Sequence, residues 1–74
     1  MTKKNFLIKL GKNIACLREK SGISQSQFAL NCDKDRQSIN RLEKGRINPS
    51  VFYLYEISIE LKIPLKDLLD FELE

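Results

Sequence analysis

The sequence contains no histidine and only two cysteines, Cys16 and Cys32, which are far apart in the chain. Without histidine or a CxxC pair, the chain lacks the ligand pattern of a structural zinc ion. We therefore expect no metal and no cofactor. Two cysteines at this spacing do not establish a disulfide, and we expect both to be reduced thiols of a cytoplasmic protein.

Glycine is also scarce, and the three glycines are not gathered into a loop that could hold a phosphate. No arrangement of nucleophile and base is visible either, so the sequence does not predict an enzyme. The apolar runs are short, and none approaches the ~20 residues that a membrane span requires. We expect no transmembrane helix, no signal peptide and no membrane partner.

A chain of 74 residues, 42% of them hydrophobic, has room for one compact domain over residues 1–74. We do not expect a second, ligand-sensing domain. Because a domain of this size buries only about 60% of its unfolded surface, pairing with a second subunit would add stability. Size alone thus favours a homodimer without establishing it.

The charges are distributed unevenly along the chain. Residues 1–46 hold eleven Lys and Arg against four acids, whereas residues 47–74 hold two lysines against six acids. This asymmetry indicates a basic face for a polyanion and an acidic end that avoids it, although solvated helix faces would give a similar count.

Hydrophobic residues recur at helical spacing through the whole chain, and no strand-like alternation persists. The sequence predicts a compact all-α bundle of five short helices. Ser21-Gly22, Asn31–Asp35 and Asn48–Ser50 break the chain, Gly45 ends the third helix and Pro64 opens the last one. Ser24, Asp35 and Ser50 are the predicted N-caps of the second, third and fourth helices. Ser24 and Gln27 also match a capping box.

The predicted second and third helices, over about residues 24–44, have the length of a helix-turn-helix. If Ile39 and Leu42 face the core, the opposite face of the third helix carries the side chains that hydrogen-bond base edges best. We interpret these as base-reading residues: Arg36, Gln37, Asn40 and Arg41. Any surface helix can carry such residues, so their neighbours matter.

Four further residues flank this face and are suited to phosphate contacts. Gln25 begins the second helix, where a side-chain amide and backbone N–H groups can hold a phosphate. Lys34, Lys44 and Arg46 lie in the adjacent turns. Contacts of this kind position a protein on double-stranded DNA without specifying sequence.

The segments LREKSGISQSQFA (17–29), RQSINRLEKGRINPS (36–50) and LKIPLKDLL (61–69) resemble the helix-turn-helix family of the phage lambda repressor and Cro, the Xre-like regulators. The resemblance implies a lambda-repressor-like DNA-binding domain that acts as a dimeric transcriptional repressor on a pseudo-palindromic operator. It matches Arg36, Gln37 and Arg41 to base-reading positions and Gln25 to a phosphate-contacting one. It also matches Arg18 and Glu43 to a structural ion pair.

The chain departs from the family pattern in the turn, where Asp33 and Lys34 replace a glycine and an aliphatic residue. Asp33 can adopt the left-handed conformation, though less readily than glycine.

Dimer contacts are expected within about residues 59–74, from Leu65, Leu69 and Phe71. The alternative function is a protein-interaction module of antitoxin or adaptor type, in which a protein partner replaces DNA.

Overall fold

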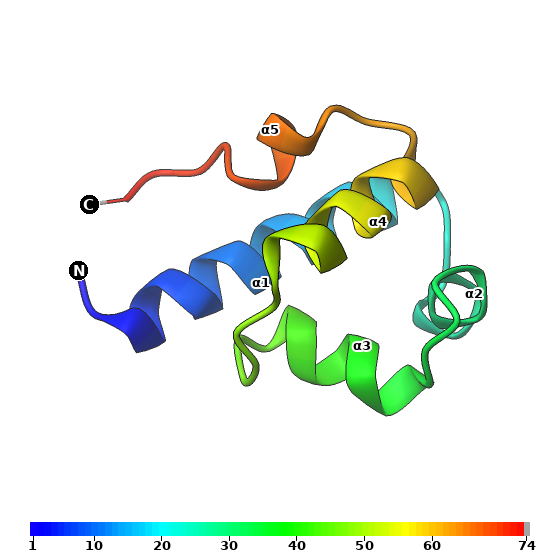
Figure 1. Cartoon of the computed structure of the whole chain (residues 1–74), viewed down its shortest axis with the longest axis horizontal. Helices are drawn as coiled ribbons and strands as arrows, with labels where there is room; N and C mark the ends of the chain where they lie inside the picture. Colours follow the sequence, from blue (N-terminus) through cyan, green and yellow to red (C-terminus); the bar gives the residue numbers. More distant parts are fainter. Residues whose placement is uncertain (74) are drawn as a thin grey trace.

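The computed structural model describes residues 1–73, which form five helices and no strand (Figure 1). The all-α prediction is confirmed. Thr2 caps the first helix, so that Lys3 and Lys4 lie in its first turn. The helices are α1 (Lys3–Lys20), α2 (Gln25–Asn31), α3 (Arg36–Glu43), α4 (Val51–Leu61) and α5 (Leu65–Leu68).

The first four helices begin with the same local structure. A side-chain oxygen of the N-cap residue accepts a hydrogen bond from the backbone N–H three residues later, which satisfies one of the free donors at the helix start. In α3, Asp35 accepts from the Ser38 N–H at 2.7 Å, and this bond lowers the pKa of Asp35. The caps are Thr2, Ser24, Asp35 and Ser50.

The capping box predicted for α2 is only half formed. Ser24 accepts from the Gln27 N–H, but the Gln27 side chain donates to Asn31 Oδ1, one turn further along the helix. The prediction that the Gln27 side chain reaches back to the Ser24 N–H was wrong, because this side chain points along α2 to Asn31 instead.

The core is made by one apolar face from each helix. Its largest fully buried side chains are Ile14, Phe28, Ile39, Leu42, Ile57 and Leu68. The helix α1 lies at the centre and packs against both α3 and α5. Asn13 on α1 donates to the backbone oxygens of Asp67 and Leu68, which fixes the end of α5.

Two glycines allow α1 and the end of α3 to approach closely. A Cβ on Gly11 would lie 2.4 Å from the backbone oxygen of Glu43. A Cβ on Gly45, which has φ +74°, would lie 2.6 Å from the Ile8 backbone. Backbone thus meets backbone at both positions, and α3 is held directly against α1.

In the turn between α2 and α3, Asp33 adopts the left-handed conformation that was considered from the sequence. Asp33 has φ +57°, and the next N–H, that of Lys34, donates to Ala29 O at 2.8 Å. The aspartate therefore occupies the glycine position of the family pattern, and the turn keeps its tight form.

Both cysteines are free in the structure. Cys16 is exposed on α1, whereas Cys32 is half-buried, and burial raises the pKa of its thiol to about 11. Within residues 1–73, no helix has the length and apolar character needed to cross a membrane.

Candidate nucleic-acid interface

The helix α3 has two chemically distinct faces. Ile39 and Leu42 are buried, with exposed fractions of 0% and 1%, and they attach the helix to the core. Arg36, Gln37 and Arg41 are exposed on the outer side. The sequence-based assignment of the two faces is confirmed by this burial.

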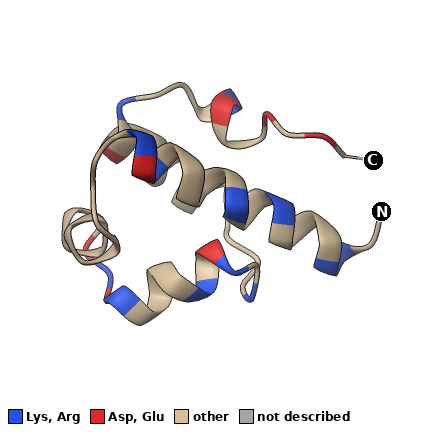
Figure 2. Cartoon of the chain, turned by 180° about the vertical axis from the view of Figure 1, so that it is seen from behind, with Lys and Arg blue, Asp and Glu red and all other residues tan. Residues whose placement is uncertain are grey.

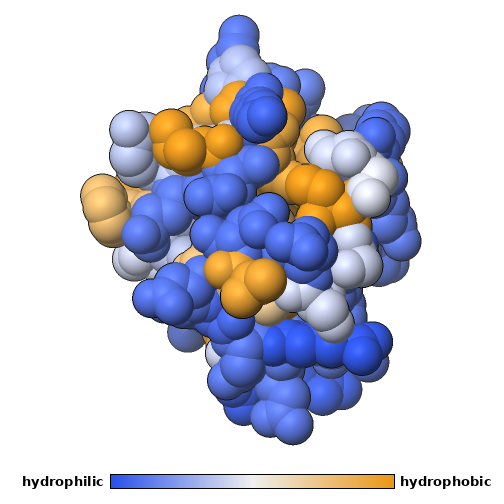
Figure 3. Space-filling view, turned by 90° about the vertical axis from the view of Figure 1, so that its right-hand side faces the viewer, coloured by the Kyte–Doolittle hydropathy of each residue, from blue (hydrophilic) through white to orange (hydrophobic). Residues whose placement is uncertain are grey.

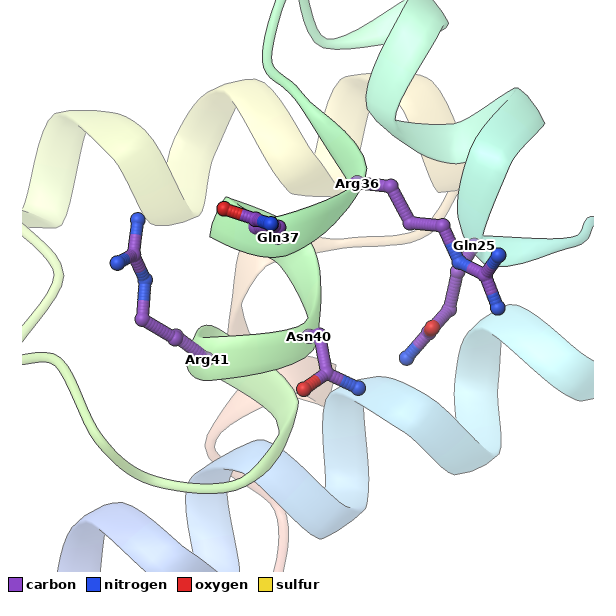
Figure 4. Close-up of a pocket in the computed structure, with 5 residues that line it drawn as sticks. All are labelled: Gln25, Arg36, Gln37, Asn40 and Arg41. Atoms are coloured by element: carbon purple, nitrogen blue, oxygen red, sulfur yellow. The ribbon is translucent and has the colours of Figure 1, made fainter.

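A shallow hollow of about 510 Å³ lies over the outer face of α3. We call it the α3 hollow. Figure 4 shows Arg41 on one side of it, Gln25 and Arg36 on the other, and Gln37 and Asn40 between them. Five of the predicted site residues, from two helices, therefore converge on one surface: Gln25, Arg36, Gln37, Asn40 and Arg41.

Beneath this surface, a buried ion pair joins α1 to α3. Arg18 Nε donates to Glu43 Oε2 at 2.6 Å, and its Nη2 donates to Oε1 at 3.2 Å. A third donor, Nη1, binds the backbone oxygen of Ile23 in the turn before α2. The hydrogen bond with Glu43 raises the pKa of Arg18. The guanidinium thus connects α1, α3 and the intervening turn.

Gln25 extends this network to the α3 hollow. Its side-chain Nε2 donates to Glu43 Oε1 at 2.8 Å, so the carboxylate oxygen receives both the amide and the guanidinium. Sequence reasoning missed this bond, because the two residues are separated by 18 positions and nothing in their local patterns connects them. We refer to these three residues as the Arg18–Glu43–Gln25 network.

The three predicted phosphate-contacting cations do not line the α3 hollow; they lie in the segments directly before and after α3. Lys34 Nζ lies 5.0 Å from the centre of the Tyr53 ring, a cation–π contact that draws it toward α4. Lys44 and Arg46 are exposed in the segment after α3. Figure 2 shows mostly basic residues on α1, α3 and this segment, both acidic and basic residues on α5, and acidic residues along the tail.

This chemistry suits a duplex of stacked bases with charged backbones. An arginine fork can pair with guanine O6 and N7, and an Asn or Gln amide can pair with adenine N6 and N7. The exposed cations on either side can neutralise phosphates. The arrangement offers hydrogen bonding at the centre of a surface and positive charge at its edge.

Comparisons with known proteins point the same way. A family model described as helix-turn-helix, HTH_3, matches residues 14–68. The chain is 37% identical to control protein C.BamHI of Bacillus amyloliquefaciens, over 90% of this chain and 84% of that protein. It is 39% identical to control protein C.MunI of Mycoplasma sp, over 82% and 84%.

A solved structure is also similar over nearly its full length. The restriction-modification controller protein C.AhdI of Aeromonas hydrophila superposes with a TM-score of 0.80 and 29% identity. The match covers 84% of this chain and 94% of that one. The helices and their arrangement are therefore shared along most of both chains.

Proposed function

Because the chain belongs to the helix-turn-helix family HTH_3 and is a DNA-binding transcriptional regulator, we propose that it acts as a homodimeric repressor on a pseudo-palindromic operator. The observation that carries the proposal is the convergence of two arginines and three amides on the α3 hollow. A helix with this outer face fits the major groove, where its N-terminal residues meet base edges.

Within this proposal, α3 supplies the sequence-specific contacts. Arg36, Gln37 and Arg41 are exposed and can extend to base edges while the core contacts of α3 stay in place. Asn40 is half-buried between them and reaches a narrower range of positions. Gln25, Lys34, Lys44 and Arg46 contact phosphates; for Lys34 this means leaving the face of the Tyr53 ring.

The relatives favour a particular kind of regulator. C.BamHI and C.MunI are named control proteins, C.AhdI is a restriction-modification controller, and this chain spans most of the length of each. We propose that this protein likewise controls the genes of a restriction-modification system, by occupying its operator. A cytoplasmic location follows from that role.

Selection from a random duplex library at near-physiological salt tests the assignment. We expect wild type to enrich a pseudo-palindromic motif, because salt weakens the nonspecific phosphate contribution. Gln37→Ala should alter preference at one position per half-site by about 1 to 3 kcal/mol. Gln27→Ala is the matched control, since that amide is on α2 and outside the α3 hollow.

No enrichment by wild type would contradict the proposed function and favour the protein-interaction module. An unchanged motif in Gln37→Ala would contradict only the assignment of Gln37 to base reading.

Four of the eight exposed large hydrophobic residues in the described part of the chain lie on α4, whereas α5 contributes only Leu69, at its C-cap. Val51, Phe52, Tyr55 and Ile59 are spaced to lie along one side of α4, and each is between 47% and 72% exposed. We call these four residues the α4 stripe. Figure 3 shows the molecule from the side of α2 and the end of α4, where apolar patches alternate with hydrophilic surface.

The residues expected from the sequence to mediate dimerisation have different surroundings. Leu65 and Phe71 are partly buried against the core, and the Phe71 ring meets Phe6 at 5.5 Å between centroids. Leu69 is 46% exposed and remains available. We propose that the homodimer forms through the α4 stripe, in a symmetric contact that places the two copies of α3 about 34 Å apart.

Light scattering of wild type, Phe52→Asp with Tyr55→Asp, and Leu69→Asp tests this interface. A charge on the α4 stripe is expected to give a monomer that binds a full operator at least about tenfold more weakly, because twofold contact buries that charge. Leu69→Asp should remain dimeric. A wild-type monomer, both free and on DNA, would contradict the homodimer, and dissociation by Leu69→Asp alone would move the contact to α5.

A further inference from the structure

The Gln25 side chain is held by the protein before any ligand arrives. One of its two amide N–H groups donates to Glu43 Oε1 at 2.8 Å. A carboxylate only accepts hydrogen bonds, so this contact fixes which end of the amide faces inward. The remaining N–H and the carbonyl oxygen are left in defined directions at the α3 hollow, which Gln25 lines.

Glu43 is in turn held by Arg18. Two guanidinium nitrogens bind both carboxylate oxygens, and the exposed fractions of the two side chains are 10% for Arg18 and 5% for Glu43. A carboxylate restrained in this way cannot rotate away from Gln25 without breaking a buried pair. The fixed orientation of the Gln25 amide therefore depends on the Arg18–Glu43 ion pair beneath it.

We propose that Glu43 is a positioning residue for DNA binding, which acts by fixing the Gln25 amide in the orientation that meets the DNA backbone. The inference rests on the proposed function, since it assigns an indirect role within the same site. A purely structural role for the ion pair would affect only stability. The proposal predicts in addition that DNA affinity depends on a hydrogen-bond acceptor at position 43, even in variants whose stability does not depend on it.

The physical basis is pre-organisation. A free glutamine side chain rotates about three bonds and must be ordered when the complex forms, which weakens binding by about three- to tenfold per side chain. A Gln25 already held by Glu43 avoids most of that loss. Arg18 also balances the carboxylate charge, so the acceptor is present without leaving an unpaired anion near the phosphates.

Two double variants separate positioning from stability. Arg18→Met with Glu43→Leu removes the charges and the acceptor, whereas Arg18→Met with Glu43→Gln removes the charges and keeps an amide oxygen that can accept from Gln25. The leucine variant should be the more stable, because it buries no polar group without a partner. The glutamine variant should bind the selected operator about three- to tenfold more tightly.

The decisive measurement is operator affinity for these two variants with Gln25 present and with Gln25→Ala. We expect the difference between them to fall below about twofold once Gln25 is absent, because the acceptor then has nothing to position. Circular dichroism and urea unfolding establish that all four proteins are folded under the conditions of the binding assay.

Three results would overturn the inference while leaving the proposed function intact. These are equal operator affinity of the two double variants, tighter binding by the leucine variant, and an affinity difference that persists in Gln25→Ala. If the glutamine variant does not fold, the side-chain amide resonances of Gln25 in wild type decide. Fast rotational averaging of that amide would exclude a held orientation, and restricted motion would support it. Failure of wild type to bind any duplex would instead overturn the proposed function.

Discussion

Replacing Gly11 with alanine is expected to destabilise the protein by about 3 kcal/mol or more, the upper range for overpacking a tight interface. The new Cβ would lie 2.4 Å from the Glu43 backbone oxygen and 2.5 Å from that of Leu42. Neither atom belongs to a side chain that could turn away. Either α1 or α3 must move, which disturbs the core contacts of Ile39 and Leu42 as well.

The sign of this effect is opposite to what helix propensity predicts. Gly11 lies within α1, and alanine there would stabilise an isolated helix by about 1 kcal/mol. Total stability for a chain of this size is about 4 to 11 kcal/mol, so the steric loss would be a large share of it. Urea unfolding followed by far-ultraviolet circular dichroism measures the difference.

Gly22→Ala is the matched control for this experiment. Gly22 has φ +75° but no atom within 4 Å of the position a Cβ would take. Its substitution should cost only the left-handed backbone penalty, about 1 to 2 kcal/mol. If Gly11→Ala were as stable as wild type, the close contact between α1 and α3 would not exist in solution.

Arg18→Met is expected to destabilise the protein by about 3 to 5 kcal/mol, because it leaves the Glu43 carboxylate buried without its counterion. The guanidinium also donates to the Ile23 backbone oxygen at 2.7 Å, so the α1–α2 turn loses a contact as well. Urea unfolding measures the loss. This single variant does not show whether the ion pair itself stabilises the fold or whether the unpaired carboxylate alone destabilises it.

Arg18→Met with Glu43→Leu answers that question. Replacing both charges with apolar groups of similar size is often neutral, so most of the lost stability should return. A double variant as unstable as Arg18→Met alone would show that the ion pair itself contributes strongly to folding. Full recovery would mean that the pair is maintained for another reason, such as the orientation of Gln25.

Local features of the fold could be predicted from the sequence because their causes are local. Ser24, Asp35 and Ser50 cap the helices as expected, since each needs only an N–H three residues away. The buried face of α3 also follows from spacing within one helix. Interactions over three or four positions are visible in the sequence itself.

Contacts between distant segments were not visible in that way. The Gln25 bond to Glu43 depends on how α2 and α3 cross, and helical spacing carries no information about it. The close approach at Gly11 looks in sequence only like a weak helix position. Phe71 looked available for a partner, but the tail folds back and its ring packs on Phe6.

The separation of the two faces of α3 also bears on how such a protein can diverge. Ile39 and Leu42 hold the helix to the core, while Arg36, Gln37 and Arg41 are exposed. Exposed substitutions of this kind usually change stability by less than about 0.5 kcal/mol. If these three side chains read the operator as proposed, a lineage could exchange them and acquire a new operator while the fold stays intact, so that duplicated copies could come to regulate different genes.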